Sequence, residues 1–133
     1  MNTTAGVSLA AGGGSWSTIS DRNAKHDFEA VDKRELLARL AKVSITTWRY
    51  KTQDASIRHI GPVAQDFHAA FGVGEDDKRI TTIDADGVAL GAIQGLHELL
   101  EEKDAQITAL RARLEKVEAA LGALARAENG GVR

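Results

Sequence analysis

A heptad repeat in the last third of the chain constrains the fold more than any other feature of the sequence. Apolar residues recur there at alternating spacings of three and four residues, which is the a/d period of a coiled coil. A lone helix would leave this apolar stripe in water, so the repeat predicts one long, self-associating helix over residues 88–128. The stripe runs through Ile93, Leu96, Leu100, Ile107, Leu110, Leu114, Val117, Leu121 and Leu124.

Lys103 occupies the one position of this seam that is not apolar. A lysine in a coiled-coil core can fix the register or the number of helices. It can also lie along the apolar surface with its ammonium in water, and then it only weakens the seam. The sequence leaves both interpretations and the number of helices open. The first turns, over residues 88–96, could pack against the rest of the chain, but too little chain exists to cover the remainder.

The middle of the chain shows the pattern of a helix followed by a β-hairpin. Asp32 is a typical helix N-cap and Glu35 can reach back to it, so a helix is expected to begin here and to end near Val43. Residues 45–50 are rich in β-branched and aromatic side chains and predict a strand. A short turn then leads to the return strand over residues 57–60.

Two further elements are expected before the long helix. Gly61-Pro62 ends the hairpin, and because proline is tolerated at a helix start, a short helix is predicted over residues 63–71. A further short strand is predicted over residues 80–83. The fold class is therefore α+β: a small globular domain over residues 20–87 with a short hairpin and helices, and then the long C-terminal helix. The short helix is expected to bury Val63, Ala64, Phe67 and Phe71.

The two ends of the chain and its overall charge add limits. Residues 1–19 are rich in Gly, Ser and Thr and are expected to be a leader or linker, and residues 129–133 a flexible tail. The formal net charge of −2 gives no broad electrostatic footprint for nucleic acid or an anionic membrane. No apolar run approaches the roughly twenty residues that span a bilayer, and the N-terminus lacks a signal-peptide pattern. A soluble protein that binds neither nucleic acid nor membrane is expected.

No metal or cofactor site is predicted. The sequence holds no cysteine, which excludes disulfides and thiolate ligands. His97 and Glu98 resemble part of a zinc-protease helix, but the second histidine is absent, so a solvated helix face is expected. The run from Asp84 to Gly87 is too short for a calcium-binding EF-hand loop and is expected to cap a helix.

Ser20 and Lys25 are the residues that most suggest chemistry. A serine hydroxyl becomes a nucleophile when a neighbouring base removes its proton. A lysine can be that base when its removal from water favours the neutral amine. Spacing alone does not establish such a pair, because a serine that caps a turn beside a solvated lysine would give the same sequence.

Three sequence blocks resemble the endosialidase-type intramolecular chaperone domain of phage tailspikes and tail fibres, also classed as peptidase family S74. The first block, over residues 14–25, has a serine followed by aspartate and, five residues after the serine, a lysine. The second, over residues 58–67, has a histidine, a glycine and an Ala-Gln pair that begins a helix. The third, over residues 83–90, leads into the long helix. The blocks occur in the order that the family shows.

The resemblance implies a self-cleaving serine endopeptidase that acts once. Cleavage would fall between Ile19 and Ser20, with Ser20 as the nucleophile and Lys25 as its base, through an N-to-O acyl shift followed by ester hydrolysis. His59 matches the family's functional histidine, and a neutral imidazole there would orient the pair or relay a proton. It could also be a strand histidine bound to a backbone carbonyl. Asp21 is expected to be structural, because a carboxylate on Lys25 would hold the lysine in its charged form.

The same resemblance implies an assembly and a function. The long helix would form a homotrimeric coiled coil that gathers three copies of an upstream β-structured fibre or spike client before the domain cuts itself off. Residues 1–19 would be the end of that client, in a virion assembled in the bacterial cytoplasm or in a bacterial surface protein of prophage origin. Alternatives are a trimerisation domain that stays uncut on a fibre, and a coiled-coil adaptor that binds another protein. The expected seam consists of Leu100, Lys103, Ile107, Leu110, Leu114, Val117, Leu121 and Leu124.

Overall fold

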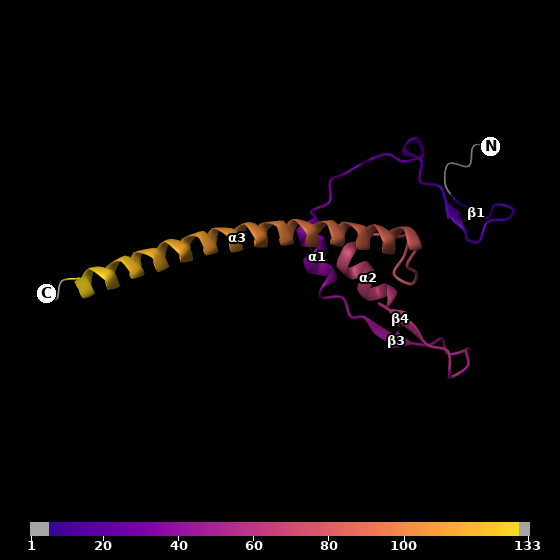
Figure 1. Ribbon diagram of the computed structural model, residues 1–133. Helices are drawn as coiled ribbons and strands as arrows, with labels where there is room; N and C mark the ends of the chain where they lie inside the picture. Colours follow the sequence, from indigo (N-terminus) through magenta and orange to yellow (C-terminus); the bar gives the residue numbers. More distant parts are fainter. Residues whose placement is uncertain (1–5, 131–133) are drawn as a thin grey trace.

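The computed structural model describes residues 6–130 as a group of short elements at one end of a very long helix (Figure 1). The long helix, α3 (Thr82–Gly130), has 49 residues. The α+β class and the long C-terminal helix are confirmed. The short elements are, in chain order, β1 (Val7–Ser8), β2 (Ser17–Thr18), the 3-10 helix η1 (Arg22–Ala24), α1 (Lys33–Leu40), β3 (Thr46–Trp48), β4 (His59–Gly61) and α2 (Ala64–Phe71).

α1 begins where the sequence predicts, at the Asp32 cap. The Asp32 carboxylate accepts hydrogen bonds from the backbone N–H groups of Arg34 and Glu35, at 3.0 and 2.9 Å. It thereby satisfies two of the donors that a helix start leaves unpaired. Glu35 does not reach back to the cap, because its carboxylate pairs with Arg39 one turn further on, at 2.9 Å. The helix ends at Leu40, slightly earlier than expected.

The predicted hairpin is present as β3 and β4, which pair antiparallel with Trp48 opposite His59. Asp54 shapes the turn between them, since its carboxylate accepts from the hydroxyl and the backbone N–H of Ser56, at 2.7 and 2.9 Å. The Ser56 hydroxyl, followed by its N–H, holds the pKa of the Asp54 carboxyl below its ordinary value. At the end of β3, the Trp48 ring and the Tyr50 ring just after it lie edge to face with centres 5.0 Å apart.

α2 buries less than the sequence predicts. Phe67 is buried at 5% exposure, while Ala64 and Phe71 are half-buried. The expected burial of Val63 is wrong, because this residue is 46% exposed. It is the N-cap of α2, where the backbone is extended, so its side chain does not follow the buried face of the helix. Gly72 ends the helix with a left-handed φ of 63°, a conformation that glycine adopts without strain.

The strand predicted over residues 80–83 is wrong, because this segment leads into α3 instead. The Thr81 hydroxyl donates to the Asp84 carboxylate at 2.6 Å and accepts from the Asp84 backbone N–H at 3.2 Å. Such reciprocal capping stabilises the first turn of a helix, and it outweighs the β preference of the side chains around it. Thr81 is therefore the residue whose side chain caps α3, while Asp84, which was expected to cap a helix, lies in the first turn and binds the Thr81 hydroxyl. α3 begins at Thr82, before the expected residue 88.

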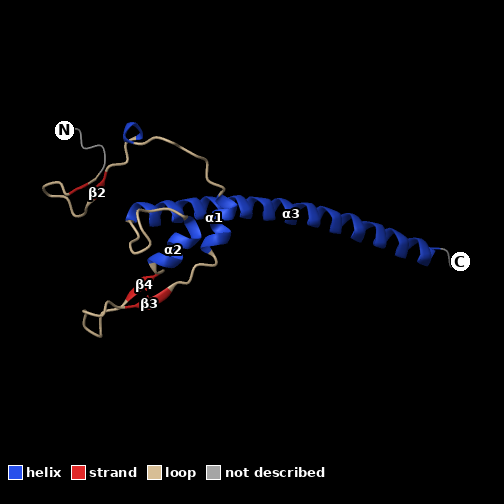
Figure 2. Ribbon diagram, turned by 180° about the vertical axis from the view of Figure 1, so that it is seen from behind, coloured by secondary structure: helices blue, strands red, loops and turns tan. Residues whose placement is uncertain are grey.

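The core of a single chain is small. α1 packs on the N-terminal part of α3 and also contacts α2. The buried apolar side chains of the described residues are Phe67, Val88 and Ala92. Beyond its contacts with α1, α3 extends away from all the other described elements (Figures 1 and 2). A chain with so few buried side chains gains little from apolar burial on its own.

The two ends of the chain are only partly described. Within the expected leader, β1 and β2 form a short antiparallel ribbon with Val7 opposite Thr18. At the other end α3 continues to Gly130, so the expected tail over residues 129–133 begins as helix. Residues 1–5 and 131–133 lie outside the described part. No helix within residues 6–130 combines the length and the apolar character that a membrane crossing needs.

Candidate functional site

Ser20 and Lys25 are in direct contact. The Lys25 Nζ donates a hydrogen bond to the Ser20 Oγ at 2.7 Å. η1 turns the chain between them, and the Lys25 backbone N–H closes that turn on the Arg22 carbonyl at 3.2 Å. The backbone is extended at Asp21, before the turn, and again at Lys25 after it. A spacing of five residues thus becomes a contact because a single 3-10 turn joins two extended segments.

Asp21 caps this turn and does not bind Lys25. Its Oδ1 accepts from the backbone N–H of Asn23 at 2.9 Å and from the side-chain amide of the same residue at 3.2 Å. Within residues 6–130, no carboxylate lies at ion-pair distance from Lys25. A carboxylate there would hold the lysine in its charged form, so its absence suits a lysine that has to act as a base.

The residues after Lys25 lead toward α1 and make local contacts on the way. Asp27 has a left-handed φ of 54°, which aspartate tolerates better than most side chains. Its carboxylate meets the His26 imidazole at 2.5 Å. The Arg22 guanidinium lies 5.6 Å from the centre of the Phe28 ring, a cation–π distance. The Arg22–Phe28 contact links the segment that leads to α1 with the turn between the serine and the lysine.

The peptide bond before Ser20 leads out of the β1–β2 ribbon. The Ile19 N–H donates to the Gly6 carbonyl at 3.0 Å, so the backbone pairing of the ribbon continues to the residue whose carbonyl precedes Ser20. Ile19 is 39% exposed. The bond that the sequence predicts to be cut therefore follows an extended, accessible segment and directly adjoins the Ser20–Lys25 contact.

This contact has the geometry that base activation of a serine requires. A general base must lie within hydrogen-bond reach of the proton that it removes, and 2.7 Å meets that condition. A charged ammonium donates to the hydroxyl, whereas a neutral amine accepts from it, so one pair of atoms serves both states. Both side chains are exposed in the single chain. Water favours the charged form of an amine, so activation needs a change that excludes water from this pair.

His59 lies apart from Ser20 and Lys25 within one chain. It is on β4, and the hairpin and η1, the small helix after β2 in Figure 2, are on opposite sides of α3 (Figures 1 and 2). Its Nε2 donates to the Gln53 Oε1 at 2.9 Å, so its partner is a side-chain amide and not the backbone carbonyl that the sequence left open. Its ring packs on the Trp48 and Tyr50 rings, with centres 4.9 and 5.6 Å away. Nothing in the sequence singled out Gln53.

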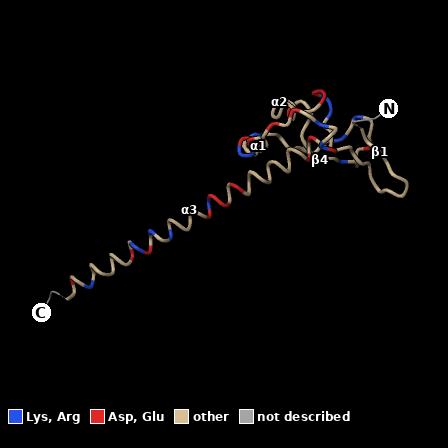
Figure 3. The backbone as a smooth tube through the Cα atoms, turned by 90° about the horizontal axis from the view of Figure 1, so that it is seen from above, with Lys and Arg blue, Asp and Glu red and all other residues tan. Residues whose placement is uncertain are grey.

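The heptad seam is exposed along its length. The nine apolar seam side chains, from Ile93 to Leu124, are each between 45% and 63% exposed in the single chain. Lys103 points its Nζ to the Gln106 Oε1 at 3.0 Å, a contact within the same helix. Lysine, arginine, aspartate and glutamate side chains are spread along the rest of α3 (Figure 3). α3 thus carries an exposed apolar stripe with the a/d period, set among charged side chains.

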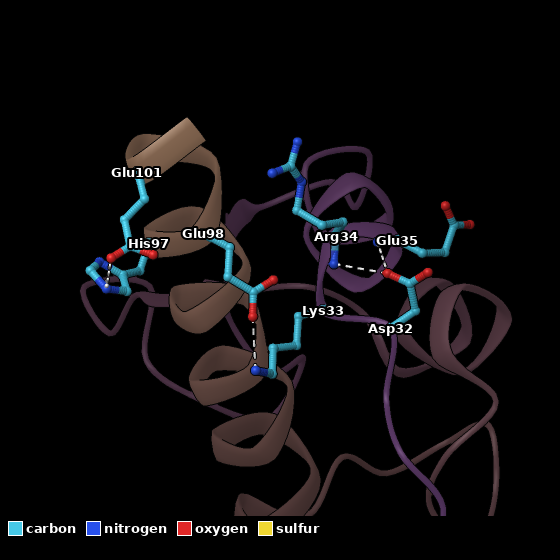
Figure 4. Close-up of polar contacts among 7 residues, drawn as sticks. All are labelled: Asp32, Lys33, Arg34, Glu35, His97, Glu98 and Glu101. Carbon is cyan, nitrogen blue, oxygen red and sulfur yellow. Dashed lines mark hydrogen bonds and ion pairs between the residues drawn. The ribbon is translucent and has the colours of Figure 1, made fainter. Parts of the chain in front are cut away.

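No metal-binding cluster of His, Cys, Asp and Glu occurs within residues 6–130. Of the two acidic side chains near His97, Glu101 makes a long contact with it and Glu98 binds a lysine of α1. The His97 Nε2 lies 3.5 Å from Glu101, one turn along α3, and Glu98 binds Lys33 of α1 (Figure 4). This stretch is therefore a charged helix face with a contact to α1.

A family model matches residues 20–73, and its description is Peptidase_S74, chaperone of endosialidase. The matched segment is less than half of the chain, so the match says what this segment is similar to. The match begins at Ser20, includes Lys25 and His59, and ends just after α2, so that α3 lies beyond it. The description of this family supports a chaperone-like role for the matched segment, and the family's name is that of a peptidase. No curated protein matches the chain.

Proposed function

We propose that this chain is a C-terminal intramolecular chaperone that gathers three copies of an upstream fibre or spike client and then cuts itself off between Ile19 and Ser20. The observation that carries the proposal is the 2.7 Å contact of Lys25 Nζ with Ser20 Oγ, at the first residue of the family segment. The exposed seam of α3 supports the assembly step. The client would belong to a virion or to a prophage-derived protein on a bacterial surface.

The proposed reaction uses groups that are already adjacent. The Ser20 hydroxyl passes its proton to the Lys25 amine while its Oγ bonds to the Ile19 carbonyl carbon. The carbon–nitrogen bond then breaks, and the leaving amine of Ser20 takes the proton back from Lys25. The product is an ester between the Ile19 acyl group and the Ser20 Oγ. Water hydrolyses this ester, which leaves a carboxylate on Ile19 and frees Ser20 as a new first residue with its hydroxyl restored.

Assembly is the proposed trigger. In the single chain the Ser20–Lys25 contact exists but both side chains are exposed, so water stabilises the charged lysine. Packing of neighbouring chains around the N-terminal end of α3 would exclude that water and favour the neutral amine. Cleavage would then follow association and not precede it, which keeps the chaperone attached until its work is finished.

The order of events suits a β-structured client. A helical coiled coil forms through local contacts and assembles fast, whereas long-range β pairing is slow and exposes edges that aggregate. A coiled coil at the C-terminus would therefore hold three chains in register before the β stalk forms. Once the chaperone is removed, a fibre that unfolds could not refold. The slow rate of unfolding would then keep the mature fibre folded.

His59 enters this proposal from a neighbouring chain. The family segment includes His59, yet the hairpin that carries it lies across α3 from the Ser20–Lys25 contact of the same chain. In a trimer three hairpins surround the coiled coil, so an imidazole from one chain can approach the serine and lysine of the next. Its role there would be to orient the lysine or to relay its proton.

One observation favours a second function, a trimerisation domain that stays on its fibre uncut. Both members of the candidate pair are exposed, and no described residue of the same chain shields them. If association of three chains leaves them in water, the lysine stays charged and the serine stays inert. The chain would then act through α3 alone, and the ribbon of residues 7–18 would remain attached.

Cleavage can be tested with a tagged, folded protein fused before Met1. We expect two bands on a denaturing gel, and a C-terminal fragment whose intact mass and first residue identify Ser20. Ser20→Ala should leave the fusion whole, whereas Ser17→Ala, at an exposed serine of β2 close by, should be cut like the parent. Light scattering should give the mass of three chains for parent and variants alike.

Each result bears on a separate part of the proposal. A parent fusion that stays whole as a trimer contradicts self-cleavage and leaves the uncut trimerisation domain. Cutting that survives Ser20→Ala contradicts the assigned nucleophile. A mass of one or two chains contradicts the trimer and favours a coiled-coil adaptor.

A further inference from the structure

Two glycines of α3 lie directly against α1. A Cβ placed on Gly95 would be 2.3 Å from the Lys33 carbonyl oxygen, and one placed on Gly91 would be 2.5 Å from the Leu36 Cδ2. Gly95 is buried, and its obstacle is backbone, which cannot turn away as a side-chain end can. α1 therefore approaches α3 more closely than any side chain at residue 95 permits.

Two ion pairs continue this contact along the same helices. Lys33 Nζ lies 2.9 Å from Glu98 Oε1 (Figure 4). One turn further along α3, Glu102 Oε2 lies 3.1 Å from Arg34 Nη1. All four side chains are about half-exposed, so each pair is weak on its own. Together with the glycines they fix both the distance and the register of α1 on α3. We name the α3 residues of this contact the docking stripe: Gly91, Gly95, Glu98 and Glu102.

The docking stripe lies on the face of α3 roughly opposite the heptad seam. Its members are spaced by four, three and four residues and so form one face of a helix with 3.6 residues per turn. The seam residues Ile93, Leu96 and Leu100 fall about half a turn away from it on the same scale. α1 can therefore remain docked on the outside of a coiled coil while the seam faces its partners.

α1 is also the next element along the chain after the candidate pair. Only residues 26–31 separate Lys25 from the Asp32 cap, and Phe28 of this segment lies against the Arg22 guanidinium of η1. A shift of α1 on α3 would therefore move Ser20 and Lys25 relative to the neighbouring chains that assemble along the seam. Misplacement by about 1 Å can slow an enzyme reaction about a hundredfold.

We propose that Gly95, supported by Gly91, is a positioning residue for self-cleavage. It touches neither Ser20 nor Lys25. It sets how closely α1 docks on α3, and through α1 it sets where the candidate pair stands in the assembled trimer. This inference rests on the proposed self-cleavage, and it adds to that function a link between the coiled coil and the cutting site.

Gly95→Ala in the fusion protein tests this link, with Gly122→Ala as the matched control. Alanine is the better helix former at both positions, so neither change weakens α3 through helix propensity. A Cβ on Gly122 would meet only the end of the Arg126 side chain, at 3.6 Å, an ordinary contact. We expect Gly95→Ala to remain trimeric but to cleave at least about tenfold more slowly, and Gly122→Ala to cleave at the parent rate.

A charge exchange gives a second readout that damage to folding would not reproduce. Lys33→Glu places two carboxylates against each other and should slow cleavage, and adding Glu98→Lys should restore the rate by restoring an opposite pair. Hydrogen exchange of the α1 amides should change in parallel with the cleavage rate. The amides should be less protected in Gly95→Ala and in Lys33→Glu than in the parent. This readout does not depend on cleavage.

The outcomes separate this inference from the proposed function. A parent fusion that stays whole overturns both. A cutting parent with a Gly95→Ala variant that cuts equally fast overturns the inference alone. Loss of the trimer in Gly95→Ala, or a Lys33→Glu defect that Glu98→Lys does not repair, also overturns it, because docking of α1 would then not be what carries the effect.

Discussion

The Lys25 side chain can influence Ser20 in two different ways. As an ammonium it only donates a hydrogen bond to the hydroxyl, whereas as a neutral amine it removes the proton and creates a nucleophile. The 2.7 Å contact is compatible with both. Asp21 helps to keep the second way open, because its carboxylate is used by Asn23 and not by the lysine.

Lys25→Arg distinguishes the two ways. An arginine can still donate to the Ser20 Oγ, but its guanidinium does not lose a proton in proteins. If Lys25 is the base, the cleavage rate of the fusion should fall by a factor between about a hundred and ten thousand. The measurement is the intact fraction on denaturing gels over time, with Lys42→Arg, at an exposed lysine after α1, as the control. A Lys25→Arg fusion that cuts as fast as the parent would show that only the positive charge matters.

At the scale of residues, the sequence predicts which residues belong to the candidate site better than it predicts which side chains contact each other. Ser20 and Lys25 could be paired in advance because a family pattern joins them, and one 3-10 turn makes their spacing a contact. The partner of His59 could not be predicted, since Gln53 reaches it only across a turn whose shape depends on Asp54 and Ser56. Side chains that meet through a loop leave no periodic signal in a sequence.

At the scale of elements, predictions succeeded where local chemistry and periodicity agree. Asp32 caps α1, and the heptads of α3 form one helix, as expected. The segment over residues 80–83 failed because its β-branched side chains favour a strand while Thr81 and Asp84 cap a helix, and the cap prevails beside a long helix. Packing of residues 88–96 against the rest of the chain was allowed for, but α1 as the partner was not predicted, since close approach at Gly95 depends on two helices meeting.

Lys103 sets an element-scale prediction about α3. In the part of the chain that the structure describes, its Nζ bonds to Gln106 of the same helix, an exposed contact that contributes little. Lys103→Leu would complete the apolar seam and should stabilise the assembled helices by about 1 to 3 kcal/mol per chain. Thermal unfolding followed by circular dichroism at fixed chain concentration measures the gain.

Lys116→Leu is the control for this change, because residue 116 lies outside the seam and should give no such gain. An unchanged midpoint in Lys103→Leu would place Lys103 outside the helix contact. Light scattering then measures the number of chains in the assembly. A variant that forms several oligomers identifies Lys103 as a device that fixes the number of helices, and an unchanged mass identifies it as a lysine that merely weakens the seam.

At the scale of the whole molecule, the single chain looks incomplete in two related respects. Among residues 6–130 it buries three apolar side chains, Phe67, Val88 and Ala92, while nine seam side chains stay exposed. It also holds His59 across α3 from the serine and lysine that the same family segment contains. Association of several chains would remedy both, since it covers the seam and brings different hairpins and pairs around one axis.

Mixed trimers test whether His59 acts between chains. One chain carries Ser20→Ala and keeps His59, and a second keeps Ser20 but carries His59→Phe, which retains ring packing against Trp48 and Tyr50 while losing the Nε2 donor. Each alone should stay whole. Refolded together with tags of different size, only the second should be cut, because the first lends it an imidazole. A Ser20→Ala, His59→Phe chain mixed with the second is the matched control and should give no product. If the second chain is cut on its own, His59 is not needed, and if it stays whole in verified mixed trimers, His59 does not act across the interface.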